Sequence, residues 1–154
     1  FGRLDIVIGN AGLLGEMAPI NHIDEAIWSN VIDVNLNANW RLIRTADPLL
    51  RQSNAGRAVF VTSGAARGKR PYWGVYAVTK AALEMMVTCW AAETEKTEMR
   101  INLLDPGATR TAMRAEAYPG EDPETVKPPQ ALTDLFVQLC TPACTQHGEV
   151  ISAY

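Results

Sequence analysis

The sequence of 154 residues lacks the features that mark several classes of protein. Cysteine occurs three times, an odd number at irregular spacing, which argues against a disulfide framework and predicts reduced thiols in a cytoplasmic protein. The 14 lysines and arginines are outnumbered by 17 aspartates and glutamates, so the charge gives no support to nucleic-acid binding. No apolar run approaches the roughly 18 residues of a membrane-spanning helix, and we therefore expect no membrane partner.

The amino terminus shows no secretory signal, because the segment from Phe1 to Asp5 has no basic region that leads into an apolar one. The first residue is Phe1 rather than methionine, and a strand-like segment follows almost at once. We therefore expect the chain to be part of a longer polypeptide. No metal site is expected, because Cys140, Cys144 and His147 lack a second pair of ligands.

The residues that are present suit one folded domain. Hydrophobic residues make up 47% of the chain and charged residues 20%, which is typical of a globular protein. Strand-like and helix-like segments alternate, and this alternation predicts an α/β fold with a parallel sheet and right-handed crossovers. The predicted strands are residues 4–9, 57–63, 99–104 and 149–152, and the predicted helices are residues 25–51, 75–96 and 131–140.

Local signals refine this outline. Asp24 is a candidate amino-terminal cap of the first helix, and Pro48 is expected to kink or shorten that helix near its end. The segment from Tyr118 to Pro129, rich in proline and acidic residues, is expected to be a mobile excursion over the surface. Ligands of such sheets bind at the carboxyl ends of the strands, which here are followed by Asn10, Ser63, and Pro106 with Gly107.

Tyr76 and Lys80 are four residues apart at the start of the second long helix, so both side chains project from one helical face. An ammonium close to a phenol lowers the phenol's pKa, which prepares the tyrosine to exchange a proton with a carbonyl or alcohol oxygen. Ser63, at the end of the preceding strand, is placed to hydrogen-bond the same oxygen. Taken singly, each residue has a plainer interpretation, because such a pair is commonly a surface contact and such a serine is commonly a turn residue.

Taken together, Ser63 and the segment Tyr76-Ala77-Val78-Thr79-Lys80 resemble the catalytic signature of the short-chain dehydrogenase/reductase family. Asn35 resembles the helix asparagine that completes the family's Asn-Ser-Tyr-Lys set. The resemblance implies that Tyr76 is the general acid/base, that Ser63 orients and polarises the substrate carbonyl, and that Lys80 lowers the pKa of Tyr76 and holds the cofactor ribose. It also implies that Asn35 holds a water molecule in a proton relay from Lys80 to solvent.

Two further segments resemble cofactor-binding parts of the same family. Asn10-Ala11-Gly12 resembles the Asn-Ala-Gly motif after a buried strand, with Gly9 in place of the family's first asparagine. Residues 100–111 resemble the strand and Pro-Gly segment beside the nicotinamide. The resemblance implies an NAD(P) cofactor, and the implied binding residues are Asn10, Ala11, Gly12, Tyr76, Lys80, Pro106, Gly107, Thr109 (through its main chain) and Thr111.

The family's Gly-rich phosphate turn and the residue that selects NAD or NADP have no counterpart in this sequence. The resemblance therefore implies a single domain, residues 1–154, that is the catalytic carboxyl-terminal part of a Rossmann domain. We expect a partial, doubly wound Rossmann-like parallel sheet of about four strands, without the family's first three. Residues 4–8 would form an exposed apolar edge, and the isolated chain is expected to bind NAD(P)H poorly, to be inactive and to aggregate.

Two functional interpretations follow. The first is an oxidoreductase that transfers a hydride between NAD(P)H and a small-molecule carbonyl or alcohol. The second is a catalytically inactive, truncated member of the family that acts as an interaction module. Leu13-Leu14-Gly15 and residues 107–114 resemble a subgroup of uncharacterised bacterial reductases, which assigns no substrate. The resemblance and the apolar long helices predict a homodimer or homotetramer, with Met85, Met86 and Trp90 in or near the contact.

The loop after the second predicted strand leaves two further interpretations open. Its basic residues Arg67, Lys69 and Arg70 either form an ordinary solvated loop or attract an anionic substrate. Tyr72 and Trp73 in the same loop either form a wall of the substrate pocket or simply pack against the rest of the protein.

Overall fold

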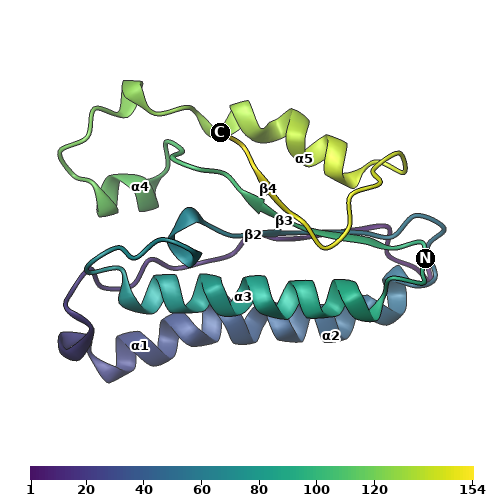
Figure 1. The fold of residues 1–154 in the computed structure, drawn as a ribbon, viewed down its shortest axis with the longest axis horizontal. Coiled ribbons are helices and arrows are strands. Elements are labelled where there is room, and N and C mark those ends of the chain that lie inside the picture. Colours follow the sequence, from purple (N-terminus) through teal and green to yellow (C-terminus); the bar gives the residue numbers. More distant parts are fainter.

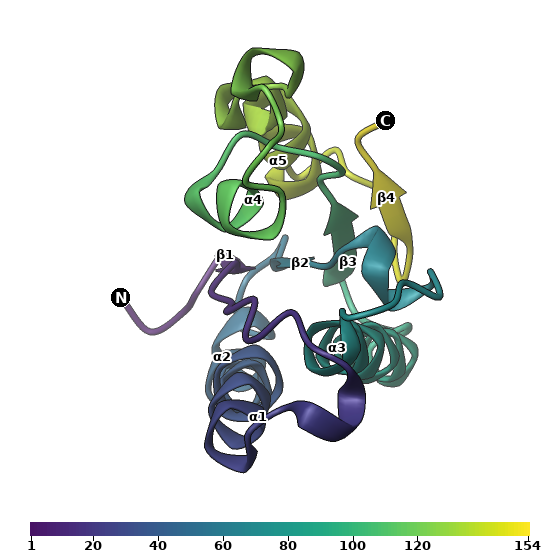
Figure 2. The same ribbon diagram turned by 90° about the vertical axis from the view of Figure 1, so that its left-hand side faces the viewer.

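The computed structural model describes residues 1–154 and shows a parallel sheet between two layers of helices (Figure 1). The strands are β1 (Ile6–Gly9), β2 (Arg57–Val61), β3 (Arg100–Asp105) and β4 (Val150–Ser152). They lie side by side in the order β1-β2-β3-β4, each parallel to its neighbour, as Figure 2 shows. The predicted α/β fold with a partial Rossmann-like sheet is confirmed, and the strands fall where the apolar segments placed them.

Three helices cover one face of the sheet and two lie on the other (Figure 1). The first layer consists of α1 (Glu25–Ile32), α2 (Ala38–Leu50) and α3 (Gly74–Glu93), and the second of α4 (Ala112–Ala117) and α5 (Thr133–Cys140). As predicted, the Asp24 carboxylate caps α1 by accepting hydrogen bonds from two free amides of its first turn. A π-helical turn, Asp33–Asn37, joins α1 to α2, and α2 continues through Pro48 to its end. Pro48 therefore does not shorten the helix.

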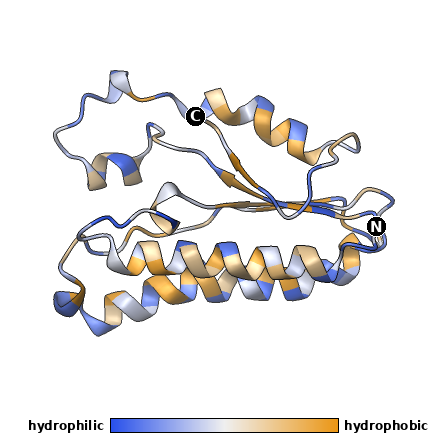
Figure 3. Cartoon of the chain, viewed as in Figure 1, coloured by the Kyte–Doolittle hydropathy of each residue, from blue (hydrophilic) through white to orange (hydrophobic).

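Two apolar clusters separate the sheet from its helices, and Figure 3 shows hydrophobic residues along the strands and along helices of both layers. Because alternate residues of a strand point to opposite faces, Phe60 and Leu103 enter one cluster while Val59 and Leu104 enter the other. The larger cluster, against α2 and α3, also includes Leu50, Leu83, Val87, Trp90 and Ile101. The smaller cluster, against α5, also includes Leu139 and Cys144.

The strand β1 lies at an edge of the sheet and pairs only with β2. Ile6 and Ile8 are each 45% exposed, whereas Val7 faces the larger cluster. The expected exposed apolar edge is therefore confirmed.

The α3 residues predicted to lie in or near a contact between subunits differ in burial. Trp90 is buried in the larger cluster, where its indole N–H donates to Asp47 Oδ1 at 2.8 Å. Met86 packs against the same cluster, whereas Met85 is 66% exposed. Trp90 is thus buried in the protein's own core, and of the three residues Met85 has the most exposed side chain.

The polar segment before α5 is held to the rest of the protein at several points. Lys127 forms a backbone bridge with Thr109, and its Nζ donates to the main-chain oxygen of Ala153 at 2.7 Å. A 3₁₀ turn, Pro123–Thr125, lies within this segment. All three cysteines are free thiols, and no helix is both long and apolar enough to cross a membrane.

Candidate active site

The predicted catalytic residues meet at the carboxyl ends of the strands. Ser63 lies two residues after β2, and Pro106 directly follows β3. Because neighbouring strands are parallel and in register, these residues lie at one edge of the sheet. α3 begins at the same edge, with Tyr76 and Lys80 in its first two turns (Figure 1). The fold therefore brings together side chains that the sequence placed on separate elements.

The Tyr76 ring is buried at this edge, where it packs with Leu14. Trp73 meets the ring edge to face, with 5.7 Å between the two ring centroids. Burial raises the pKa of the Tyr76 phenol above its ordinary value, because the phenolate would lose its solvation. The nearby Ser63 hydroxyl lowers this pKa, and the Asp105 carboxylate raises it.

Lys80 lies one helical turn after Tyr76 and is 3% exposed. Its Nζ donates to the main-chain oxygen of Val61 at 2.9 Å and lies 5.6 Å from the centroid of the Tyr76 ring. Burial lowers the pKa of Lys80 to about 8. The Lys80 ammonium lies over the Tyr76 ring, as the sequence predicted. The pKa of the phenol is nevertheless raised rather than lowered, because burial outweighs the other effects on it.

The π-helical turn between α1 and α2 places Asn35 in the interior, fully buried. Its Oδ1 accepts from the Leu13 amide at 2.7 Å, and its Nδ2 donates to the Leu13 main-chain oxygen at 2.9 Å and to Thr79 Oγ1 at 3.0 Å. The Thr79 hydroxyl in turn donates to the main-chain oxygen of Tyr76 at 2.8 Å. The Asn35 side chain therefore ties the turn after β1 to α3, and its Oδ1 keeps one lone pair free for a further donor.

The sequence analysis did not single out Thr79. Its only signal is its position between Tyr76 and Lys80, on the helix that carries both.

Ser63 follows β2 and caps the 3₁₀ turn Gly64–Ala66, with its Oγ accepting from the Ala65 amide at 3.2 Å. A hydroxyl both accepts and donates, so its proton is available to another oxygen. The Ser63 hydroxyl is also close enough to Tyr76 to lower the pKa of the phenol. Ser63 and Tyr76 thus present two hydroxyl donors to one place.

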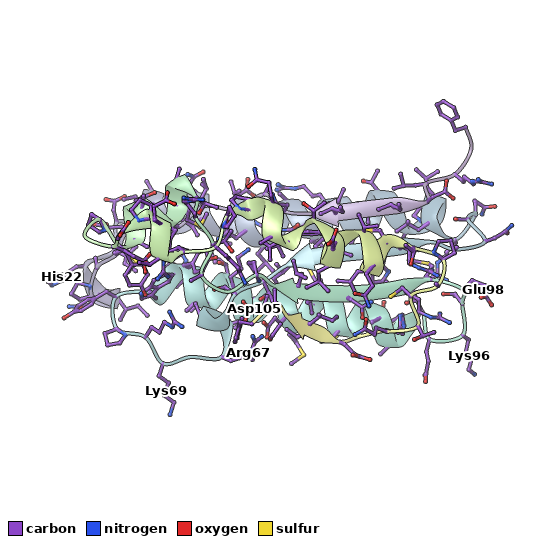
Figure 4. All side chains as sticks on the ribbon, turned by 90° about the horizontal axis from the view of Figure 1, so that it is seen from above. His22, Arg67, Lys69, Lys96, Glu98 and Asp105 are labelled. Atoms are coloured by element: carbon purple, nitrogen blue, oxygen red, sulfur yellow. The ribbon has the colours of Figure 1, made fainter.

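Asp105, at the end of β3, is a buried carboxylate next to the site that the sequence analysis missed. It accepts from Arg67 Nη2 at 2.6 Å and from the Tyr154 hydroxyl at 3.2 Å. Arg67 also pairs with Glu84. In Figure 4, Arg67 and Asp105 lie close together, whereas Lys69 projects away from the ribbon. Two carboxylates therefore neutralise Arg67, which leaves it no free charge with which to attract an anion.

The turn after β1 leaves room beside Lys80. A Cβ atom on Gly12 would lie 3.5 Å from both Asn35 Oδ1 and Lys80 Nζ, so glycine keeps this space free. Lys80 uses one of its three ammonium hydrogens on Val61, and the others remain for hydroxyl groups of a ligand. This donor and this open space fit the ribose of a dinucleotide. Asn10 and Ala11 are exposed on the same turn.

The segment after β3 approaches other groups closely. Gly107 has a φ of +64°, and a Cβ there would lie 2.7 Å from the Tyr154 ring, so a larger residue does not fit. The Thr109 hydroxyl turns back toward the main-chain oxygens of Pro106 and Gly107, at 3.4 and 3.3 Å. Thr111 caps α4, its Oγ accepting from the amide of the third residue of that helix at 3.1 Å.

Position 9 holds glycine, where the resemblance led us to expect an asparagine, and the packing around it explains the difference. A Cβ atom on Gly9 would lie 2.4 Å from the Phe60 ring and 2.8 Å from Asn39 Oδ1. The large Phe60 side chain on the neighbouring strand therefore occupies the space that an asparagine at position 9 would need.

A cavity of about 390 Å³ lies beside the turn that follows β1. Its lining includes Leu13, Leu14, Ile27, Val31 and Glu116. None of the predicted catalytic side chains lines it, but Leu14 packs with Tyr76 and the Leu13 main chain hydrogen-bonds the Asn35 side chain.

Comparison with known proteins points to one family. The family model described as short chain dehydrogenase matches residues 1–122. The chain is 42% identical over 139 residues to the uncharacterized oxidoreductase YciK of Escherichia coli strain K12, which covers 90% of this chain and 55% of that protein. It is 37% identical over 114 residues to an uncharacterized NAD-dependent oxidoreductase of Mycobacterium tuberculosis H37Rv, covering 73% of this chain and 41% of that protein.

Among solved structures, a short chain dehydrogenase of Escherichia coli CFT073 complexed with NADPH superimposes with a TM-score of 0.94 at 40% identity. The superposition covers 99% of this chain and 64% of that one. This chain thus spans less than two thirds of the length of each of these relatives.

Proposed function

The chain belongs to the short chain dehydrogenase family, and we propose that it carries the catalytic residues of an NAD(P)-dependent oxidoreductase acting on a small-molecule carbonyl or alcohol. The observation that carries this proposal is the burial of Tyr76 and Lys80 on one face of α3, with Ser63 beside the phenol. In this proposal, residues 1–154 form the catalytic carboxyl-terminal part of a Rossmann domain.

Tyr76 is the proton donor in the direction of reduction. Its hydroxyl passes a proton to the carbonyl oxygen as charge develops there. The raised pKa keeps the phenol protonated at neutral pH, which is the form this direction needs. The Ser63 hydroxyl donates a hydrogen bond to the same oxygen and stabilises its charge. The Lys80 ammonium, over the Tyr76 ring, favours the phenolate once the proton has left.

NAD(P) is the cofactor in this proposal, and a bound nicotinamide supplies the hydride. The NADPH complex of one relative and the NAD dependence of another support this choice. The ammonium hydrogens that Lys80 keeps free beside Gly12 suit the ribose hydroxyls. The residues proposed to contact the cofactor are Asn10, Ala11, Gly12, Tyr76, Lys80, Pro106, Gly107, Thr109 and Thr111.

Tyr76→Phe tests the proposed proton donor, because it removes the hydroxyl and keeps the ring that packs on Trp73. In the full-length polypeptide, we expect NADPH oxidation with ketone substrates to fall by about 100-fold or more, with NADPH affinity nearly unchanged. Initial rates and calorimetric titration with NADPH measure the two effects. Tyr72→Phe, at an exposed tyrosine in the loop that precedes α3, is the matched control.

Equal turnover by Tyr76→Phe and the wild type would contradict the assignment. A full-length wild type that neither binds NADPH nor turns over would instead favour the second interpretation, an inactive member of the family that acts as an interaction module.

We also propose that the chain forms a homodimer or homotetramer through the outer surfaces of α2 and α3. Trp40 on α2 is 49% exposed, and Val78 and Met85 on α3 are 43% and 66% exposed. These apolar side chains lie on the outer layer of the molecule, and a second copy would remove them from water.

A further inference from the structure

The segments that follow β2 and β3, up to and including α4, carry four arginines, and three of them have an acidic partner. Arg67 pairs with Asp105 and Glu84, Arg110 with Glu124, and Arg114 with Glu121. Arg70 is the exception, because no carboxylate lies within 4.0 Å of its guanidinium. The only free arginine charge in these segments is therefore that of Arg70.

The Arg70 guanidinium is directed toward the site. Its Nη2 lies 3.9 Å from the position of a Cβ on Gly64, the residue that follows Ser63. Its Nη1 lies 3.5 Å from the Tyr118 hydroxyl, and its Cζ lies 5.7 Å from the centroid of the Trp73 ring. Arg70 thus stands between the aromatic side chains and the loop that carries Ser63, with most of its five N–H donors unused.

Aromatic rings connect this cation to the proposed proton donor. The Trp73 ring lies 5.7 Å from the Tyr76 ring and 5.9 Å from the Tyr118 ring, measured between centroids. Trp73 and Tyr118 are half-buried, so each keeps surface that a planar group can cover. A ligand that lies along this wall would have one end at the Tyr76 hydroxyl and the other at Arg70.

The backbone between Arg70 and Trp73 adopts an unfavourable conformation. Tyr72 has a φ of +71°, the single positive φ among residues other than glycine, and its side chain is 59% exposed. A bulky residue in this conformation costs free energy, and such strain is commonly found at binding sites. This strained residue lies between Arg70 and Trp73, whose guanidinium and ring lie against each other.

We propose that Arg70 recognises a carboxylate on the carbonyl substrate, and that Trp73 and Tyr118 hold a planar, apolar body between that carboxylate and the reacting carbonyl. This inference rests on the proposed function and names its substrate class as aryl or similarly planar keto acids and the corresponding hydroxy acids. A planar guanidinium suits a carboxylate because the two groups form paired hydrogen bonds.

The test compares 4-acetylbenzoate with its methyl ester, which keeps the planar body but replaces the charged carboxylate with a neutral ester. Each is titrated into the ¹⁵N-labelled full chain without cofactor, and Kd is read from the shifts of the Arg70 side-chain and Trp73 indole signals. We expect the acid to bind about 10-fold more tightly than the ester, as one charged hydrogen-bonding partner allows. The difference is expected to shrink as salt is added, because Arg70 is exposed.

Variants assign the preference to one side chain. Arg70→Ala is expected to equalise the two Kd values, and Arg70→Lys to retain part of the difference. Lys69→Ala, which removes the neighbouring outward-pointing cation, is expected to leave the ratio unchanged (Figure 4). Equal Kd values in the wild type, no binding of either probe, or a preference that survives in Arg70→Ala would each overturn the inference.

The outcome separates this inference from the proposed function. Arg70-dependent binding of the acid, without its reduction by NADPH in the full-length polypeptide, would count against the proposed function. Reduction of both probes, with no effect of Arg70 on their binding, would count against the inference alone.

Discussion

Replacing Lys80 with methionine is expected to stabilise the fold at neutral pH. Lys80 is 3% exposed, and burial lowers its pKa from the ordinary 10.5 to about 8. A difference of one in pKa corresponds to about 1.4 kcal/mol, so keeping the charged form buried costs the fold about 3 kcal/mol at pH 7. Methionine has a similar shape and no charge, but it leaves the Val61 carbonyl without its partner, which costs about 1 kcal/mol. The free energy of unfolding of Lys80→Met is therefore expected to exceed that of the wild type by about 2 kcal/mol at pH 7.

The gain has a defined dependence on pH. Because the pKa of Lys80 is lower in the folded state than in the unfolded chain, the unfolded chain binds more protons between about pH 8 and pH 10.5. The stability of the wild type therefore rises across this range, and the penalty is fully present only below it. Lys80→Met lacks the titrating group, so its advantage over the wild type is expected to shrink by about 2 kcal/mol between pH 7 and pH 10.

Urea unfolding followed by circular dichroism at pH 7 and pH 10 measures both quantities. Lys96→Met is the control, because Lys96 is exposed at the end of the molecule far from the site (Figure 4). Its difference from the wild type is expected to be small and the same at both pH values. A Lys80→Met difference that does not change with pH, or that grows toward pH 10, would refute the reasoning that Lys80 is a buried cation.

Three further predictions test other parts of the structure. Arg57→Met is expected to lower the free energy of unfolding by about 3 kcal/mol, because the buried guanidinium donates to four main-chain oxygens. The control Arg44→Met, at an exposed arginine, should change this free energy by less than about 0.5 kcal/mol. Equal effects of the two variants in urea unfolding would contradict this account. Tyr72→Gly is expected to be about 1 kcal/mol more stable than Tyr72→Ala, because only glycine adopts the positive φ without strain. Thermal unfolding compares the two variants, and equal stabilities would contradict the strain. The double variant Trp40→Glu, Met85→Glu is expected to be monomeric in light scattering at a concentration where the wild type is a dimer, and a monomeric wild type would rule out the proposed association.

Local patterns account for most of the elements but not for their internal detail. The strands and helices were predictable because apolar spacing, caps and turn residues act over a few positions. The π-helical turn at Asp33–Asn37 was not, since nothing in the periodicity of the long helix marks a widened turn. Trp90 shows the same limit, because its place in the core depends on Phe60 and on Asp47, which accepts from its indole.

The charged groups near the site show why the remainder required the three-dimensional arrangement. Arg67 and Arg70 lie three residues apart in one basic loop, and the sequence offered the same interpretations for both. The carboxylates that neutralise Arg67 come from positions 17 and 38 residues further along the chain, on α3 and at the end of β3. Only the packing of these elements shows that Arg70 is left without an acidic partner.

The sequence by itself determined that strands and helices alternate and that Tyr76 and Lys80 share a helical face, because both follow from the fixed geometry of a strand or a helix. The tertiary structure alone decided the directions of the Tyr76 and Lys80 pKa shifts, the partners of Asn35 and the charge that remains in the loop. These properties depend on burial and on side chains contributed by distant segments, and neither is a property of neighbouring residues.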